Sequence, residues 1–283
     1  MPISERPVTD APRRSMEPRE FDEIRELAYR TFGLDLKPGK EEMVSARLQR
    51  LVTAGGFRSF HHYHQHVVHD STGRSLAALV DALATNHTSF LRERDHFDFF
   101  REHVIPELSR RKSASIWCAA SATGEEVWTL ACVLNDALPP ASIRIHASDV
   151  SNKALRVAQA GEYGAERCEG IPADWLSCYF QKAPANSGAY TVAPRIRAQV
   201  EFRRLNLVTP FHWPLQFPAV FCRNVMIYFD RATQEKVVAA IADCLEPGGY
   251  LFVGHAESMA GISTSLEYVR PAVYRKPGGK AGR

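Results

Sequence analysis

The strongest constraint on the fold is an alternation of strand-like and helix-like segments over the carboxyl-terminal part of the chain. Short apolar segments at 115–119, 143–148 and 219–222 are typical of buried strands, and each is followed by a longer segment with helical periodicity. Another strand is predicted at 250–254, after a Pro-Gly-Gly turn. This spacing predicts an α/β fold with a doubly wound, Rossmann-like parallel sheet. Residues 266–274 predict a terminal hairpin that forms an antiparallel edge.

The alternation breaks after the second strand and its helix. Residues 190–192, Ile196 and residues 200–202 have the pattern of short strands, and the turn-rich segment 184–188 precedes them. This pattern predicts a small antiparallel β insertion at about 178–202 in the larger domain, which we assign to residues 113–283.

The amino-terminal part is predicted to be a separate all-helical domain over residues 18–85. Four segments carry apolar residues three or four positions apart, and Ser59 is the predicted N-cap of the third helix. Residues 1–17 are rich in Pro, Arg, Ser and Glu, so we expect a disordered tail. Residues 86–112 form a linker, which includes an amphipathic helix at 95–106.

Composition excludes several classes of protein. The 283 residues carry a formal net charge of only +3, which disfavours a general nucleic-acid binder. No apolar run approaches the ~20 residues of a membrane helix, and the polar, proline-bearing start does not resemble a secretory signal. We therefore expect a cytoplasmic protein.

The cysteines and histidines do not predict a metal site. The six cysteines are scattered without a CxxC pair, which favours buried, reduced thiols. Five of the eleven histidines gather between residues 61 and 69, but no cysteine or carboxylate accompanies them at ligand spacing. A helix surface carrying histidines is the favoured interpretation.

The first candidate binding loop joins the strand at 115–119 to the next helix. It consists mainly of small residues and ends in Glu125 and Glu126 at the electropositive helix start. It contains neither GxGxxG nor a Walker lysine, and two carboxylates would repel a pyrophosphate. They suit a cationic ligand such as S-adenosylmethionine, although a glutamate that only stabilises the helix start is an equally good interpretation.

Two further strands end in polar residues, at the sheet edge where open α/β folds bind ligands. Asp149 follows the second strand and is a candidate acceptor for ribose hydroxyls, although it could instead cap the next helix, a role that Ser151 could share. Arg223 and Asn224 follow a buried strand, with Tyr228 close behind. For Arg223 the alternative is a surface ion pair.

The linker segment 86–93 is also polar. By itself it predicts only a helix start, with Thr88 or Ser89 as the cap. Linkers between domains often cover ligands, however, so these residues are further candidates for a binding site.

Five segments together resemble the CheR-type chemotaxis receptor methyltransferases. They are, in chain order, NHTSFLRE, WCAASATGEE, FRRLNL, FCRNVMIYFD and LEPGGYLFVGHAES. The resemblance covers about residues 20–275. It implies an S-adenosylmethionine-dependent protein-glutamate O-methyltransferase that forms glutamyl methyl esters on chemoreceptors during sensory adaptation.

The resemblance also implies roles for individual residues. Arg92 and Tyr228 are expected nearest the transferred methyl group and are the candidate catalytic residues. Glu125 is expected at the methionine end of the cofactor, and Glu126 is the open alternative. Asp149 is expected at the ribose. The full set of implied cofactor-binding residues is Asn86, Thr88, Arg92, Glu125, Asp149, Asn206, Leu207, Arg223 and Asn224.

The reaction needs little acid–base chemistry. A glutamate side chain has an ordinary pKa of ~4.3 and is already ionised at pH 7, so no general base is required. The enzyme must align carboxylate oxygen, methyl carbon and sulfur. We expect Arg92 to orient the substrate carboxylate through paired donors and Tyr228 to lie near the methyl group.

The amino-terminal domain is expected to dock the substrate. Arg47 and Arg50 give its second helix a basic face that suits the acidic cytoplasmic helices of membrane chemoreceptors. A merely solvated helix face is the alternative, and the resemblance favours docking. Competing functions are a nucleic-acid methyltransferase and a non-catalytic S-adenosylmethionine-binding regulator. The presence of Arg92 and Tyr228 favours the enzyme.

Overall fold

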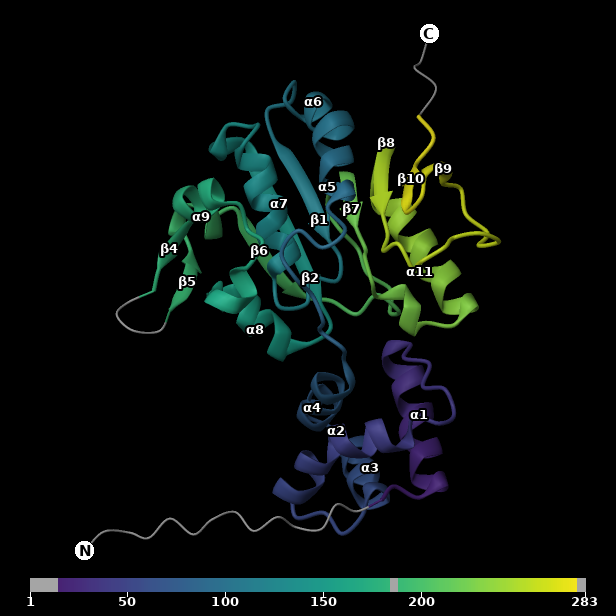
Figure 1. The fold of residues 1–283 in the computed structure, drawn as a ribbon. Helices are drawn as coiled ribbons and strands as arrows, with labels where there is room; N and C mark the ends of the chain where they lie inside the picture. The colour runs from purple at the N-terminus through teal and green to yellow at the C-terminus, as the bar shows by residue number, and fades with distance from the viewer. Residues whose placement is uncertain (1–14, 184–187, 279–283) are drawn as a thin grey trace, which may run out of the picture.

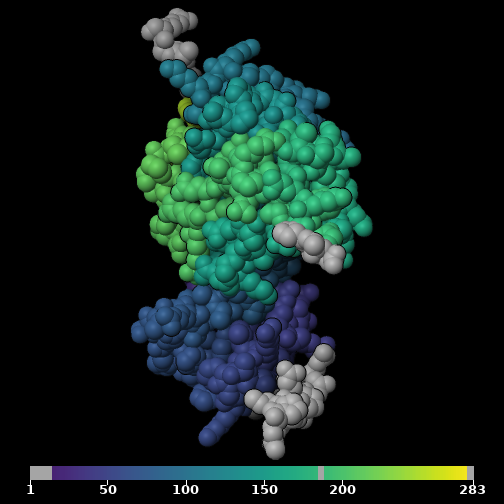
Figure 2. Space-filling view, turned by 90° about the vertical axis from the view of Figure 1, so that its left-hand side faces the viewer, coloured from purple at the N-terminus to yellow at the C-terminus, as the bar shows by residue number. Residues whose placement is uncertain are grey.

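The computed structural model describes residues 15–183 and 188–278 and contains a helical bundle beneath a larger α/β domain (Figure 1). Figure 2 shows the bundle as a separate lobe below the larger one. Most of the predicted tail, residues 1–14, lies outside the described residues. None of the described helices is both long enough and apolar enough to cross a membrane.

The bundle has the four predicted helices, and their ends have local causes. Gly33 ends the first with φ 74°, a left-handed conformation that glycine adopts without strain. Ser59 caps the third, because its side chain accepts a hydrogen bond from the His62 amide at 3.0 Å. The helices are α1 (Pro18–Phe32), α2 (Glu41–Ala54), α3 (Phe60–His69) and α4 (Arg74–Leu83).

The larger domain confirms the predicted doubly wound sheet. Its seven strands lie in the order β6-β2-β1-β7-β8-β10-β9, and β10 runs antiparallel to both of its neighbours, as the terminal hairpin predicted. The strands are β1 (Ala114–Cys118), β2 (Ile143–Asp149), β6 (Val200–Arg204), β7 (Phe217–Phe221), β8 (Leu245–Phe252), β9 (Glu267–Arg270) and β10 (Val273–Arg275). The strand order reverses between β2 and β7 on either side of β1, which is where such sheets bind ligands.

Helices cover both faces of this sheet (Figure 1). Ile116 of β1 is buried with Leu130 of α7 in one apolar layer, whereas Trp117 is buried with Val237 and Ile241 of α11 in the other. Successive strand side chains point to opposite faces, so a single strand serves both layers. The helices of this domain are α7 (Glu125–Asn135), α8 (Asn152–Ala160), α9 (Ala173–Tyr179), α10 (Pro194–Arg197) and α11 (Arg231–Cys244), with short turns η2 (Pro140–Ser142), η3 (Ala165–Cys168) and η4 (Met226–Tyr228).

The linker continues into the helical segment predicted at 95–106. This segment consists of α5 (Asp95–Phe99), one π-helical turn η1 (Phe100–Val104) and α6 (Ile105–Leu108). Pro106 follows the π turn and has no amide hydrogen to donate to the helix, and an irregular turn accommodates that loss.

The predicted β insertion exists, but its strands differ from the prediction. A separate antiparallel sheet has the order β3-β5-β4, formed by β3 (Glu162–Gly164), β5 (Ala189–Val192) and β4 (Phe180–Lys182). Ile196 lies in α10, and residues 200–204 form β6, which pairs in parallel with β2 at the edge of the main sheet. Residues 200–202 form a strand as predicted, but their place in the insertion was wrong, because a short alternating segment does not encode its pairing partner. The strand predicted at Ile196 was also wrong. Residues 184–187 lie outside the described part of the chain.

Candidate active site

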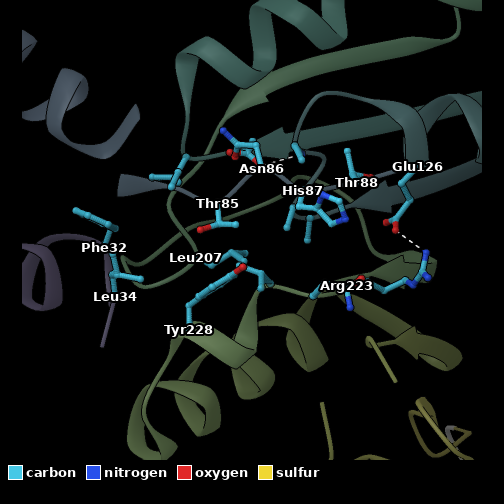
Figure 3. Close-up of a pocket in the computed structure, with 18 of the residues that line it drawn as sticks. Phe32, Leu34, Thr85, Asn86, His87, Thr88, Glu126, Leu207, Arg223 and Tyr228 are labelled. Carbon is cyan, nitrogen blue, oxygen red and sulfur yellow. Dashed lines mark hydrogen bonds and ion pairs between the residues drawn. The ribbon is translucent and has the colours of Figure 1, made fainter. Parts of the chain in front are cut away.

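A pocket lies at the carboxyl ends of β1, β2 and β7, between the two domains (Figure 3). The linker after α4 covers it with residues 84–88, and Phe32 and Leu34 close it from the bundle side. Its position is the reversal point of the strand order, as expected for this sheet topology. The predicted residues that line it are Asn86, Thr88, Arg92, Asp149, Asn206, Leu207, Arg223, Asn224 and Tyr228.

Glu125 is the predicted residue that does not line this pocket. Its side chain is buried, forms an ion pair with Arg167 and accepts a hydrogen bond from the Thr123 hydroxyl at 2.8 Å. Glu126 lines the pocket instead. The two glutamates are the first residues of α7, and consecutive helical side chains point about 100° apart, so only one of them can face the pocket. The structure therefore favours the alternative that the sequence left open.

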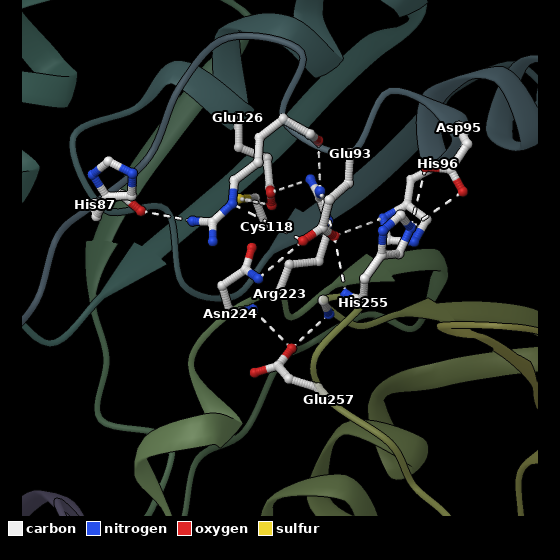
Figure 4. Close-up of polar contacts among 12 residues, drawn as sticks. His87, Glu93, Asp95, His96, Cys118, Glu126, Arg223, Asn224, His255 and Glu257 are labelled. Atoms are coloured by element: carbon white, nitrogen blue, oxygen red, sulfur yellow. Dashed lines mark hydrogen bonds and ion pairs between the residues drawn. The ribbon is translucent and has the colours of Figure 1, made fainter.

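Arg223 is the centre of a buried polar network beneath the pocket (Figure 4). Its Nη1 lies 2.6 Å from Glu126 Oε2, and its Nη2 donates to Glu93 Oε2 at 3.0 Å and to the Arg92 carbonyl at 2.6 Å. The side chain has no exposed surface, so the alternative of a surface ion pair is wrong. Burial alone would lower the pKa of Arg223, but the carboxylates of Glu126 and Glu93 outweigh it and raise that pKa. The guanidinium therefore remains a cation.

Glu93 was not predicted as a site residue, and it connects the linker to the sheet. Its Oε1 accepts a hydrogen bond from the Asn224 side chain at 3.1 Å, and its Oε2 accepts from Arg223. Burial raises the pKa of Glu93, but hydrogen bonds from Asn224 and Arg223 outweigh that effect and lower it. Glu93 could have been found from its position as the last residue of NHTSFLRE, one of the segments that carry the family resemblance.

The linker is also more tightly turned than predicted. Leu91 and Glu93 have φ values of 54°, and the next helix, α5, begins at Asp95 with Arg94 at its N-cap. The predicted helix start with Thr88 or Ser89 as cap is therefore wrong. Without a helix there, the segment is free to wrap over the pocket, and Arg92 Nη1 donates to the His87 carbonyl at 2.8 Å across this turn.

Glu257 was also missed, and it holds the loop that follows β7. Its carboxylate accepts backbone N–H groups from Asn224 at 2.7 Å, Met226 at 2.6 Å and Gly254 at 2.5 Å. Asn224 has φ 58°, an uncommon conformation for a residue with a side chain, and these bonds keep it there. Burial raises the pKa of Glu257, although the backbone donors oppose that shift.

Asp149 presents a buried carboxylate to the pocket. Its Oδ1 accepts the Ser151 amide and its Oδ2 accepts the Ala122 amide, both at 2.8 Å. Ser151, not Asp149, is the N-cap of α8, because its hydroxyl accepts the Ala154 amide at 3.0 Å. Each carboxylate oxygen of Asp149 retains acceptor capacity for a hydroxyl ligand. Burial raises the pKa of Asp149 despite its backbone donors.

Asn206 and Tyr228 connect the pocket to the bundle. The Asn206 side chain donates to the Thr31 carbonyl at 2.7 Å, and the Tyr228 carbonyl accepts the Asp35 amide at 2.9 Å. Figure 3 shows Tyr228 on the wall opposite Thr88. The docked bundle therefore helps to shape the pocket.

A groove adjoins the pocket between α2 and residues 226–234. It shares Leu34, Thr85, Tyr228 and Phe229 with the pocket. Its acidic lining residues are Asp35 and Asp230, and its basic ones are Lys37, Lys40, Arg47 and Arg231. The balance of charge in the groove is therefore basic.

The two predicted docking arginines differ in their surroundings. Arg47 Nη1 donates to the Leu83 carbonyl at 2.6 Å and Nη2 donates to the Thr85 hydroxyl at 3.1 Å, so it fastens α2 to the end of α4. Arg50 is exposed. Of the two arginines on the expected basic face of α2, Arg47 therefore stabilises the bundle and Arg50 faces solvent.

The chemistry of the pocket fits S-adenosylmethionine. Asp149 offers acceptors for ribose hydroxyls, and Glu126 offers a carboxylate for a cationic group. Apolar groups from Phe32, Leu207 and Val225 provide surfaces for a flat ring. The pocket therefore offers a matching group for the ribose, for the cationic methionine end and for the flat ring of S-adenosylmethionine.

Comparison with known proteins agrees with this chemistry. A model described as CheR methyltransferase, SAM binding domain, matches residues 86–274, and one described as CheR methyltransferase, all-alpha domain, matches residues 19–84. Chemotaxis protein methyltransferase 2 of Pseudomonas aeruginosa is 36% identical over 262 residues, covering 90% of this chain and 92% of that protein. The chemotaxis protein methyltransferase of Escherichia coli is 33% identical over 260 residues, covering 90% and 89%. With its two matched domains and an S-adenosylmethionine-compatible pocket at their junction, the chain belongs to the CheR methyltransferase family.

Proposed function

We propose that this chain methylates glutamate side chains of chemotaxis receptors and so forms glutamyl methyl esters. The observation that carries the proposal is the continuity of the basic groove with the cofactor pocket through Thr85 and Tyr228. A receptor helix in that groove would bring a carboxylate to the pocket mouth. The names of the relatives, chemotaxis protein methyltransferases, support this substrate class.

The roles of the residues follow from the chemistry of methyl transfer. S-adenosylmethionine supplies an electrophilic methyl group on a sulfonium. Arg92, whose side chain is 31% exposed, orients the incoming carboxylate, which is ionised at pH 7 and needs no base. Tyr228 forms the wall beside the reacting atoms, and Asp149 accepts the ribose hydroxyls. The remaining proposed contacts are Asn86, Thr88, Asn206, Leu207, Arg223 and Asn224.

The first experiment measures transfer of a radiolabelled methyl group from S-adenosylmethionine to membranes that contain chemoreceptors. Base-labile label on a receptor band is the expected result, because methyl esters hydrolyse in base. Label that resists base would contradict the proposed ester. Tight cofactor binding without transfer would support the non-catalytic regulator instead.

A second experiment tests Arg92. Arg92→Ala is expected to lower turnover by 10-fold or more by loss of a charge-assisted contact, on the order of 1.5–3 kcal/mol. Arg94→Ala is the matched control, because Arg94 is exposed and does not line the pocket. Unchanged cofactor binding and unchanged turnover in Arg92→Ala would refute its assignment.

For the methionine end of the cofactor we propose Glu126 in place of Glu125. The two substitutions Glu126→Gln and Glu125→Gln are compared by cofactor affinity, because only Glu126 lines the pocket. Glu126→Gln also weakens the pair with Arg223 and so lowers stability as well. We expect Glu126→Gln to weaken cofactor binding measured by calorimetry, and Glu125→Gln to lower mainly the free energy of unfolding through loss of the Arg167 pair. The reverse pattern would restore Glu125 as the contact.

We propose that receptor docking uses the basic groove and the α2 surface, with Arg50 as its free charge. Arg50→Glu is expected to raise KM for the receptor and to leave cofactor affinity intact. Arg47→Glu should in addition lower stability, because Arg47 binds the end of α4. Arg25→Glu on α1 is a charge-matched control away from the groove. An unchanged receptor KM for Arg50→Glu would exclude this docking surface.

A further inference from the structure

A cluster of three metal-ligating side chains lies beside the pocket and outside the residues proposed for methyl transfer. Glu93 and His96 come from the linker and α5, and His255 follows β8. Their ligand atoms all lie within 4.8 Å of one another, and Figure 4 shows the three side chains converging. This cluster was not predicted, because His255 lies far from Glu93 and His96 along the chain.

His96 provides an independent indication of a ligand. Its side chain is fully buried, and neither ring nitrogen has a hydrogen-bond partner among the described residues. Its Nδ1 lies 3.6 Å from Glu93 Oε2, beyond hydrogen-bond distance. A buried polar atom without a partner costs about 1–3 kcal/mol, and an ion bound to one ring nitrogen of His96 would remove that cost for this nitrogen.

The surrounding residues resemble the outer shell of a metal site. His255 Nε2 lies 3.1 Å from Asp95 Oδ1, and a carboxylate on a ring nitrogen is the usual way to orient a metal-binding imidazole. Glu93 also accepts hydrogen bonds from Arg223 and Asn224, which fix its carboxylate. The His255 side chain is 46% exposed, so an ion has a path from solvent.

The donor set indicates the class of ion. Two imidazole nitrogens and one carboxylate oxygen are ligands of Zn²⁺ and similar divalent transition metals, whereas Ca²⁺ and Mg²⁺ prefer oxygen donors. Three protein ligands leave a further coordination position for water on the exposed side. We propose that Glu93, His96 and His255 bind one divalent transition-metal ion, with Zn²⁺ as the representative ion and Asp95 in its outer shell.

The site has a structural consequence for the pocket. An ion held there joins the linker to the loop after β8 through Glu93, the residue that also positions Arg223 and Asn224. Metal binding and cofactor binding are therefore coupled, and linkage requires that each ligand change the affinity of the other by the same factor.

The test is calorimetric titration of the metal-free full chain with ZnCl₂, together with the visible absorption of Co²⁺ as a report of nitrogen ligation. One ion per chain is expected. His255→Gln removes a direct ligand, so it should weaken binding by at least the roughly 10–100-fold that loss of an outer-shell partner costs, and it should change the Co²⁺ spectrum. It should not prevent folding, because the side chain is exposed at the surface rather than packed in the core.

Two matched variants complete the experiment. His103→Gln alters an exposed histidine outside the cluster, and His61→Gln alters one of the gathered histidines of α3, where His61 contacts Glu23. Both should bind Zn²⁺ as the unmodified chain does. The proposal is overturned if no stoichiometric binding is found, if His255→Gln binds as tightly as the unmodified chain, or if His61→Gln loses the ion.

Discussion

Arg223 makes three polar contacts beneath the pocket and is covered by Phe97, whose ring centroid lies 5.4 Å from the guanidinium carbon. A guanidinium has five N–H donors in a fixed plane, which lets one side chain serve Glu93, Glu126 and a backbone carbonyl together. An ammonium group has the same charge but cannot span these positions. The geometry of the donor, in addition to its charge, therefore holds the linker against the sheet.

Arg223→Lys is accordingly expected to lower the free energy of unfolding by about 1–3 kcal/mol, because buried carboxylate oxygens lose their donors. Cofactor affinity should fall by 10-fold or more as the pocket wall loosens. Urea unfolding and calorimetry measure the two effects. Arg231→Lys, which alters an exposed pair with Glu235, is the control and should change neither quantity appreciably.

The raised pKa of Asp149 predicts a pH dependence of cofactor affinity. Burial raises this pKa, so the carboxyl protonates at a higher pH than an exposed aspartate and then offers fewer acceptor sites to hydroxyls. Affinity should therefore fall as pH is lowered from 7.5. Because the shift is upward, protonation of Asp149 favours the folded state, so this group does not itself contribute to acid unfolding.

Calorimetry across this pH range checks the prediction. Asp149→Asn should have lower affinity at pH 7.5 and a flatter pH profile, whereas exposed Asp174→Asn should behave as the unmodified chain. A profile as steep in Asp149→Asn as in the unmodified chain would assign the titration to another group.

At the scale of elements, the turn between β1 and α7 sets how closely that helix approaches α8. Gly124 has φ 99°, and a Cβ there would lie 2.8 Å from both Ala158 Cβ and Tyr163 Oη. Tyr163 also accepts a hydrogen bond from Trp128 and donates to the Thr123 carbonyl. Glycine at this position therefore permits both the turn and the close packing behind the pocket loop.

Gly124→Ala is expected to lower the free energy of unfolding by more than Gly170→Ala. Both glycines have positive φ, with 88° at Gly170, but a Cβ at Gly170 meets nothing within 4 Å. Backbone strain costs on the order of 1–3 kcal/mol in either variant, and only Gly124→Ala adds a steric clash. Chemical denaturation of both variants measures the difference. Equal losses would mean that crowding at Gly124 has no effect on stability.

At the scale of the molecule, contacts from both ends of the bundle hold the two domains together. At one side the Tyr29 hydroxyl donates to Asp230 at 2.7 Å, and at the other the Ser151 hydroxyl donates to Asp81 at 2.7 Å. Asp81 also accepts the Lys153 amide at 3.2 Å, so α4 helps to satisfy the start of α8. The pocket lies between these two interdomain contacts.

Asp81→Ala should loosen this junction. Loss of the acceptor for Ser151 and the Lys153 amide is expected to cost about 1 kcal/mol of stability and to increase proteolytic cleavage in residues 84–94. Asp22→Ala, which alters a surface pair with Arg25 on α1, is the control. Cleavage rates that match the control would show that Asp81 does not fasten the domains.

The sequence by itself determined the features whose causes are local. Gly33 and Ser59 end or begin helices through contacts within a few residues, and the strand–helix alternation predicts the sheet class because side-chain periodicity reflects burial on one face or two. The polar residues that follow the buried strands, among them Asp149, Arg223 and Asn224, line the pocket for the same reason, since parallel strands end at one edge. The other predicted pocket residues, Asn86, Thr88, Arg92, Asn206 and Leu207, came from the family resemblance.

Only the tertiary structure decided features that depend on distant partners. Residues 200–204 joined β2 because its edge was available, and Glu126 faces the pocket because α7 is fixed in rotation by its packing. Glu93 lies beside His255 because the folded linker contacts the loop that follows β8. Local sequence does not predict such tertiary contacts, because their energy arises from burial and pairing between segments that are far apart along the chain.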